Sequence, residues 1–131
     1  MATVELEIPP RSVYVGVVRL AVASLARAAG LDEGTVYDLK IAVSEACATA
    51  VLGLEDSGAD EPITITFSES ETSLELVVAD RARSTEGDPA DSQGFDTRST
   101  MSLALLESLV DHCEISPRDG GGSITRLTVA R

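Results

Sequence analysis

A carboxylate and a hydroxyl stand one helical turn apart in residues 43–51, which read VSEACATAV. Glu45 and Thr49 are four positions apart, so on a helix they share one face. That face is offset from the apolar positions of the same segment. The two side chains could therefore point together into a cleft. The alternative, an ordinary solvent-exposed pair, remains open from the residues alone.

Two helices are expected in the first half of the chain, and the second of them carries this pair. The first is expected from about Ser12 to Ala29, with Gly30 as its stop. Its apolar residues recur at helical spacing, which is typical of a core-facing stripe. The stripe comprises Val13, Val17, Leu20, Ser24 and Ala28, widened by Val18 and Leu25.

The second helix carries Glu45 and Thr49. Asp32 or Thr35 is expected to cap it, and it should run to about Leu54. Its continuous apolar face is expected to comprise Val36, Leu39, Val43, Ala46, Cys47, Ala50 and Leu54.

Alternating apolar and polar residues predict strands near residues 4–8, 63–68 and 74–78, with Asp80 at the end of the third. A long irregular stretch, 81–99, precedes a third helix near 103–110 and two strands near 113–115 and 124–129. Short turns between paired strands favour antiparallel neighbours. This order predicts an α+β two-layer sandwich, with about three helices on one face of a mixed, mostly antiparallel sheet of about five strands.

The composition bounds the class of protein. A length of 131 residues suits one domain, and a hydrophobic fraction of 44% suits a globular core. Aromatic residues make up only 3%, so the core must be aliphatic. The formal net charge of −12 argues against direct contact with nucleic acid or an anionic membrane. It suits a partner with a basic patch, or simply solubility.

Several features of the sequence do not indicate a metal site, a disulfide framework or a membrane span. Cys47 and Cys113 lack metal-ligand spacing and are too few for a disulfide framework, so we expect buried apolar residues and no metal site. The lone His112 is expected at the surface or at a helix end. No apolar run reaches the roughly 18 residues of a membrane span, and no signal-peptide pattern is present. We therefore expect a cytoplasmic protein.

Residues 40–51, KIAVSEACATAV, resemble the asparagine box of bacterial anti-sigma-factor serine kinases of the RsbW type. These belong to the ATPase family of histidine kinases, gyrase and Hsp90, in which the segment reads close to S-E-A-x-x-N-A. The resemblance implies that Glu45 activates water or the acceptor hydroxyl, as general base if the protein is active. It puts Thr49 where the family's asparagine holds the magnesium ion.

Further landmarks follow in the family's order. Residues 77–82, VVADRA, resemble the first glycine box, with Asp80 at the position that binds the adenine amino group and Ala82 in place of the glycine. The loop 83–99 falls where the family has its ATP lid.

In residues 100–103, Thr100 and Ser102 replace both glycines of the second glycine box. Ser123 lies in residues 122–127, GSITRL, which resemble the family's closing strand. The resemblance spans about residues 3–129. It implies a single histidine kinase-like ATPase domain over residues 1–131, with the Bergerat-type fold.

The departures from the family pattern fall on the phosphate end of the site. Thr100 and Ser102 place side chains where backbone N–H groups must approach phosphate closely. The hydroxyl of Thr49 is shorter than an asparagine amide and would sit farther from a magnesium ion. We therefore expect weak or absent ATP binding and no cofactor; ATP and magnesium belong to the site if it is functional.

Arg19 aligns with an arginine that family members use to contact sigma and anti-anti-sigma partners. The resemblance implies a homodimeric regulator that binds a sigma factor, its STAS-type anti-anti-sigma antagonist, or both. One alternative is an active ATP-dependent serine kinase that phosphorylates the antagonist. Another is a dimerisation partner of an active relative, without a sigma target.

Overall fold

Segments with alternating apolar residues build one antiparallel sheet. The computed structural model describes residues 3–58, 60–81, 103–118 and 121–131. The strands are β1 (Thr3–Ile8), β2 (Ile63–Glu69), β3 (Ser73–Ala79), β4 (His112–Pro117) and β5 (Ser123–Ala130). They lie in the order β1-β2-β3-β5-β4, and each of these neighbouring pairs is antiparallel. Buried and half-buried residues alternate along β2 and β3, so one face of the sheet faces the core.

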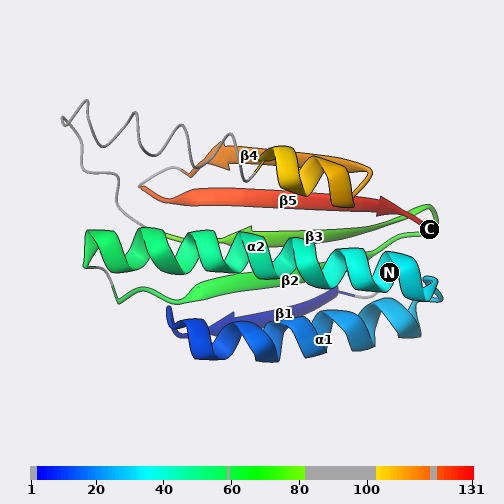
Figure 1. The fold of residues 1–131 in the computed structure, drawn as a ribbon, viewed down its shortest axis with the longest axis horizontal. Coiled ribbons are helices and arrows are strands. Elements are labelled where there is room, and N and C mark those ends of the chain that lie inside the picture. The colour runs from blue at the N-terminus through cyan, green and yellow to red at the C-terminus, as the bar shows by residue number, and fades with distance from the viewer. Residues whose placement is uncertain (1–2, 59, 82–102, 119–120) are drawn as a thin grey trace.

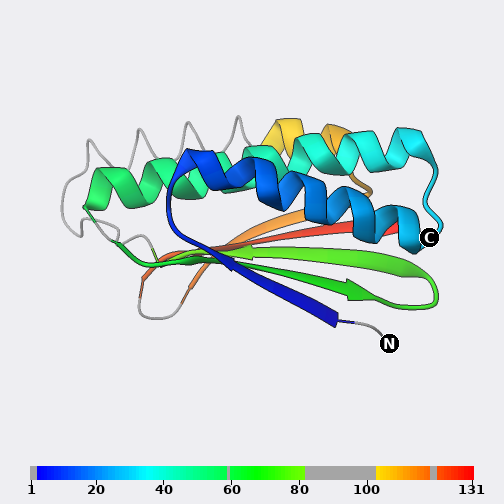
Figure 2. The same cartoon turned by 90° about the horizontal axis from the view of Figure 1, so that it is seen from below.

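The helices of the described residues lie on one side of this sheet (Figure 2). They are α1 (Val15–Ala28), which follows the short 3₁₀ turn η1 (Ser12–Tyr14), then α2 (Glu33–Ser57), and a helical segment at 103–109. Figure 1 shows α2 over the middle of the sheet, α1 on the side of β1, and the segment 103–109 over β4 and β5. The expected two-layer α+β sandwich is confirmed. None of the described helices is both long and apolar enough to cross a membrane.

Helix α2 is the centre of the core. The backbone N–H of Thr35 donates to Oδ1 of Asp32 at 2.7 Å, so Asp32 is the cap and Thr35 supplies the donor. The predicted apolar face of α2 is confirmed: Leu39, Val43 and Leu54 are each at most 1% exposed. Cys47 and Cys113 are both buried, as expected. Burial raises the pKa of the Cys47 thiol to about 12, so this thiol is a neutral core group at pH 7.

The predicted core-facing stripe of α1 is wrong for its five main residues, and only the two residues that widen it are right: Val18 is buried and Leu25 is half-buried against the core. Val13, Val17 and Leu20 are 75%, 51% and 69% exposed, and Ser24 and Ala28 are exposed as well. The opposite side of the helix is in the core instead. Its buried residues are Val15, Val18, Val22, Ala23 and Ala26. Because both sides of α1 are apolar, periodicity could not choose between them, and the side rich in valine and alanine packs against α2.

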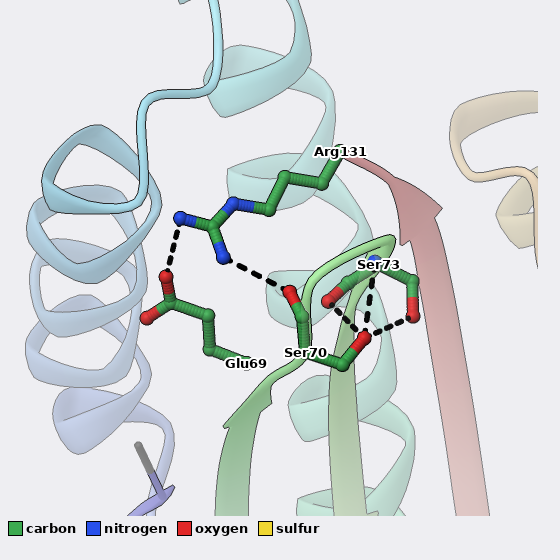
Figure 3. Close-up of polar contacts among 4 residues, drawn as sticks. All are labelled: Glu69, Ser70, Ser73 and Arg131. Atoms are coloured by element: carbon green, nitrogen blue, oxygen red, sulfur yellow. Dashed lines mark hydrogen bonds and ion pairs between the residues drawn. The ribbon is translucent and has the colours of Figure 1, made fainter. Parts of the chain in front are cut away.

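The turn between β2 and β3 is fixed by polar contacts with Arg131 (Figure 3). One Nη atom of Arg131 forms an ion pair with Glu69 at 2.6 Å, and the other donates to the carbonyl of Ser70 at 2.9 Å. Within the turn, the hydroxyl of Ser70 hydrogen-bonds to Ser73. These contacts close the ladder of β3 and β5 at this end of the sheet.

We expect the cap of α2 to add a pH-dependent part to the stability of the fold. The hydrogen bond from the Thr35 backbone lowers the pKa of the Asp32 carboxyl. A group whose folded pKa is lowered stabilises the fold above its unfolded pKa, and this contribution is lost as the pH falls through the folded pKa. Asparagine caps a helix about as well as aspartate but does not titrate.

Urea unfolding of the wild type and of Asp32→Asn, measured from pH 7 down to about pH 3, checks this expectation. The wild-type midpoint should fall relative to that of D32N below about pH 4. Asp32→Ala should lower the midpoint at neutral pH, because it removes the cap itself. Parallel pH profiles for the wild type and D32N would contradict the assignment.

Candidate functional site

Asp80 lies directly after β3 and is a buried acidic residue, 4% exposed. The pairing of Ala79 with Ile124 brings the end of β3 beside the start of β5. The hydroxyl of Ser123 donates to Oδ2 of Asp80 at 2.8 Å, and the Asp80 N–H donates to the Ser123 carbonyl at 3.0 Å. The structure therefore brings together two residues of the predicted site that are far apart in sequence, and it fixes the orientation of the carboxylate.

Gly122 makes this arrangement possible, and the sequence analysis did not single it out. Its φ of +105° is in the region that favours glycine. A Cβ atom built on Gly122 would overlap the carbonyl oxygen of Asp80 and lie 2.7 Å from Cα of Arg81. Only a residue without a side chain lets β5 begin this close to Asp80. The available signal was the position of Gly122 at the start of residues 122–127, which resemble the family's closing strand, but the sequence analysis assigned it no role.

Glu45 and Thr49 occupy successive turns of α2 and are both half-buried. Between them, Cys47 is 0% exposed and points into the core. The pair thus lies on the border between the buried face of α2 and its solvent-facing side, where a polar side chain can reach a ligand without leaving water completely.

Arg19 connects the two helices beside this pair. Its Nε donates to the hydroxyl of Ser44 at 2.8 Å, and that hydroxyl donates to the carbonyl of Lys40 at 2.6 Å. Ser44 immediately precedes Glu45, so an exposed residue of α1 is hydrogen-bonded to the turn of α2 that carries the candidate general base. The sequence singled out Arg19 but gave no sign of its bond to Ser44, which depends on how the helices cross.

The remaining predicted site residues, Ala82, Thr100 and Ser102, lie outside the described residues, as does the lid-like loop 83–99. His112 was predicted at the surface or at a helix end, and in the structure it is the exposed first residue of β4. It therefore lies at the surface, on a strand and not at a helix end.

The described residues of the candidate site differ in chemistry between its two ends. At the base end, Asp80 is a buried carboxylate held by Ser123, which suits recognition of an exocyclic amino group. At the phosphate end, Thr49 offers a single neutral hydroxyl. Over the described ranges, no cluster of three or more His, Cys, Asp or Glu side chains could hold a metal ion.

This architecture agrees with the comparison with known proteins. The sequence profile of the histidine kinase-like ATPase domain matches residues 8–129, so the chain belongs to the histidine kinase-like ATPase domain family. The particular relatives are serine-protein kinases named RsbW. The chain is 31% identical over 127 residues to RsbW of Bacillus velezensis, with 89% of this chain and 79% of the relative covered. It is 32% identical over 129 residues to RsbW of Bacillus pumilus, with 89% and 80% covered.

The fold also matches a crystal structure of the RsbU and RsbW domains of a Mycobacterium tuberculosis protein. The TM-score is 0.72 at 19% identity, and the match covers 100% of this chain. The chain spans 33% of the length of that structure. The resemblance to the RsbW type and the Bergerat-type fold that it implied are thus confirmed.

We expect Gly122→Ala to destabilise the protein more than a matched glycine substitution does. Gly30 also has a positive φ, +89°, but a Cβ built there meets nothing within 4 Å. Gly30→Ala should therefore lower the free energy of unfolding by about 1 kcal/mol, through backbone strain alone. Gly122→Ala adds the overlap with Asp80 and should lose at least about 1 kcal/mol more. Urea unfolding measures both values; equal losses would show that the close approach to Asp80 is unimportant.

Proposed function

We propose that this chain is an anti-sigma-factor-type regulator that binds a sigma factor, its STAS-type anti-anti-sigma antagonist, or both. The similarity to RsbW serine-protein kinases over 89% of the chain supports this class of partner. Binding depends on the surface around α1 and Arg19, which is exposed and hydrogen-bonded to α2. The regulator acts as a homodimer in the cytoplasm, and competition between its protein partners releases the bound protein.

The proposal includes weak or absent ATP binding, and one observation carries this part. Thr49, on the border of α2, presents a hydroxyl where the family pattern has the amide that holds magnesium. Among the described residues, no group of three or more histidine, cysteine, aspartate or glutamate side chains could hold a metal ion by itself. A triphosphate beside Glu45 would meet a carboxylate without a bound cation to screen it.

An active serine kinase is the second candidate, and two observations favour it. The relatives carry the name serine-protein kinase. At the base end of the site, the Asp80 carboxylate is buried and accepts a hydrogen bond from Ser123 at 2.8 Å. In this version Glu45 is the general base toward a serine hydroxyl of the antagonist.

Calorimetry with Mg-ATP separates the two versions. We expect no saturable binding by the wild type up to about 1 mM nucleotide. Thr49→Asn should restore measurable binding, because it supplies the amide ligand, and Thr49→Ser should leave binding as weak as in the wild type. Micromolar binding by the wild type, with transfer of labelled phosphate to a serine of a STAS protein, would establish the kinase version.

The contribution of Arg19 to partner binding is tested by comparing two variants. Arg19→Ala removes both the guanidinium and its bond to Ser44, whereas Ser44→Ala removes only the bond. We expect R19A to weaken partner binding at least tenfold, about 1.4 kcal/mol, and S44A to weaken it much less. Affinity for the sigma factor or STAS protein recovered with the tagged chain from its native host is the readout. Equal losses in the two variants would make Arg19 a structural residue and not a contact.

A further inference from the structure

Thr125 is a polar residue in an apolar part of the core. It is 8% exposed and, with Asp80, it is one of the two buried polar residues in the described part of the chain. Its side chain is on the core-facing side of β5, on which Leu127 is also buried. Its paired residues are Val78 on β3, which is buried, and Ile115 on β4, which packs against the core. The hydroxyl of Thr125 is therefore surrounded by aliphatic side chains.

This hydroxyl has no hydrogen-bond partner among the described residues. Other hydroxyls of the chain are bonded locally: Ser44 and Ser108 donate to carbonyls of their own helices. A buried hydroxyl without a partner lowers stability, because it has lost its bonds to water. Within the same described ranges, every fully enclosed side-chain N or O atom has a partner. The Thr125 oxygen is consequently not fully enclosed, and a nearly buried polar group that keeps an open approach is typical of a ligand contact.

The strand register places Thr125 beside the Asp80 carboxylate. Thr125 pairs with Val78, and two residues further along the same strands Asp80 and Ser123 are joined by hydrogen bonds. Because side chains alternate between the faces of a sheet, Ser123 and Thr125 point to one face, and so do Val78 and Asp80. Two residues span about 7 Å along a strand. One small ligand on this face can therefore contact both Asp80 and Thr125.

We propose that Thr125 is a specificity-determining residue, whose hydroxyl donates a hydrogen bond to a ring nitrogen of an adenine nucleoside while the amino group of the base donates to Asp80. A carboxylate has more acceptor positions than the bond from Ser123 uses, but when ionised it has no donor. The hydroxyl of Thr125 supplies that donor. Together the two side chains complement an amino group and a ring nitrogen, the pair of groups that adenine carries.

This inference rests on the proposed function only in placing a base at Asp80. It requires neither magnesium nor a protein partner, because a nucleoside brings no phosphate group to Thr49. Hypoxanthine has a carbonyl oxygen in place of the amino group of adenine, so it would direct an acceptor at the Asp80 carboxylate. The nucleosides adenosine and inosine therefore serve as the matched pair of probes.

Titration of the full chain with adenosine, followed by backbone amide NMR shifts, tests the contact. We expect saturable binding in the millimolar range, with shifts at the ends of β3 and β5, and at least fivefold weaker binding of inosine. Thr125→Val keeps the branched shape and removes only the hydroxyl. It should weaken adenosine binding about fivefold, the loss expected for one hydrogen bond. Thr125→Ser keeps a hydroxyl and should stay within twofold of the wild type.

Thr128 provides the matched control, because it is on the same strand, half-buried, and points to the opposite face of the sheet. Thr128→Val should change adenosine binding less than twofold. Deazaadenosines, each with one ring nitrogen replaced by carbon, identify the nitrogen that accepts the bond. One of them should bind the wild type about fivefold more weakly than adenosine does, and it should bind T125V as well as it binds the wild type.

Urea unfolding separates a ligand contact from a structural role of Thr125. T125V removes a hydroxyl that has no partner within the described chain, so its urea midpoint should equal or exceed that of the wild type. A threonine that served only the fold would lose stability and binding together. Unchanged or higher stability with weaker adenosine binding is therefore the combination that supports the proposal.

Three results would overturn the proposal. One is the absence of saturable adenosine binding by the wild type up to about 10 mM. Another is equal adenosine binding by the wild type and T125V, which would leave Asp80 alone to select the base. The third is a lower urea midpoint of T125V. Recovery of a sigma factor or STAS protein with the tagged chain tests the proposed function separately, and T125V should recover it as the wild type does.

Discussion

The packing of α2 against the sheet is the constraint on which the other elements depend. With 3% aromatic residues and no tryptophan, the core is filled by aliphatic side chains that demand close approach of the two layers. Leu39, Val43, Cys47 and Leu54 are at most 1% exposed. Because this face is completely occupied, the polar residues of α2 are excluded from it, and the half-buried Glu45 and Thr49 lie on its border. Glu45 and Thr49 are therefore placed by the same packing that stabilises the domain.

The two ends of the candidate site are built in different ways. Asp80 is positioned by strand pairing and by a hydrogen bond from a neighbouring strand, so its geometry belongs to the sheet. Glu45 and Thr49 are positioned by the rotation of a helix. A substitution such as threonine for asparagine can therefore alter the helix end of the site without disturbing the sheet end. The geometry of the sheet end therefore does not depend on which residue stands at position 49.

Much of the fold could be predicted from the sequence, because strong periodicity has only one interpretation when a single face is apolar. Helix α2 and the two strands that flank Asp80, β3 and β5, show such a one-sided apolar pattern. Helix α1 was different: both of its faces are apolar, and the choice between them depends on packing against α2. The bond between Arg19 and Ser44 and the close approach of Gly122 to Asp80 likewise arise between segments distant in sequence. Residue types alone contain no record of such contacts.

The contacts at opposite ends of β3 and β5 have a mechanical consequence for the sheet. At one end, Arg131 forms bonds to Glu69, Ser70 and the Thr72 carbonyl. At the other end, Gly122 and Ser123 fit against Asp80. A slip of one residue between the strands would turn every side chain to the wrong face and break both sets of contacts at once. The register of β3 and β5 is thus fixed at both ends. Because Asp80 directly follows β3, the position of its carboxylate is fixed by the same register.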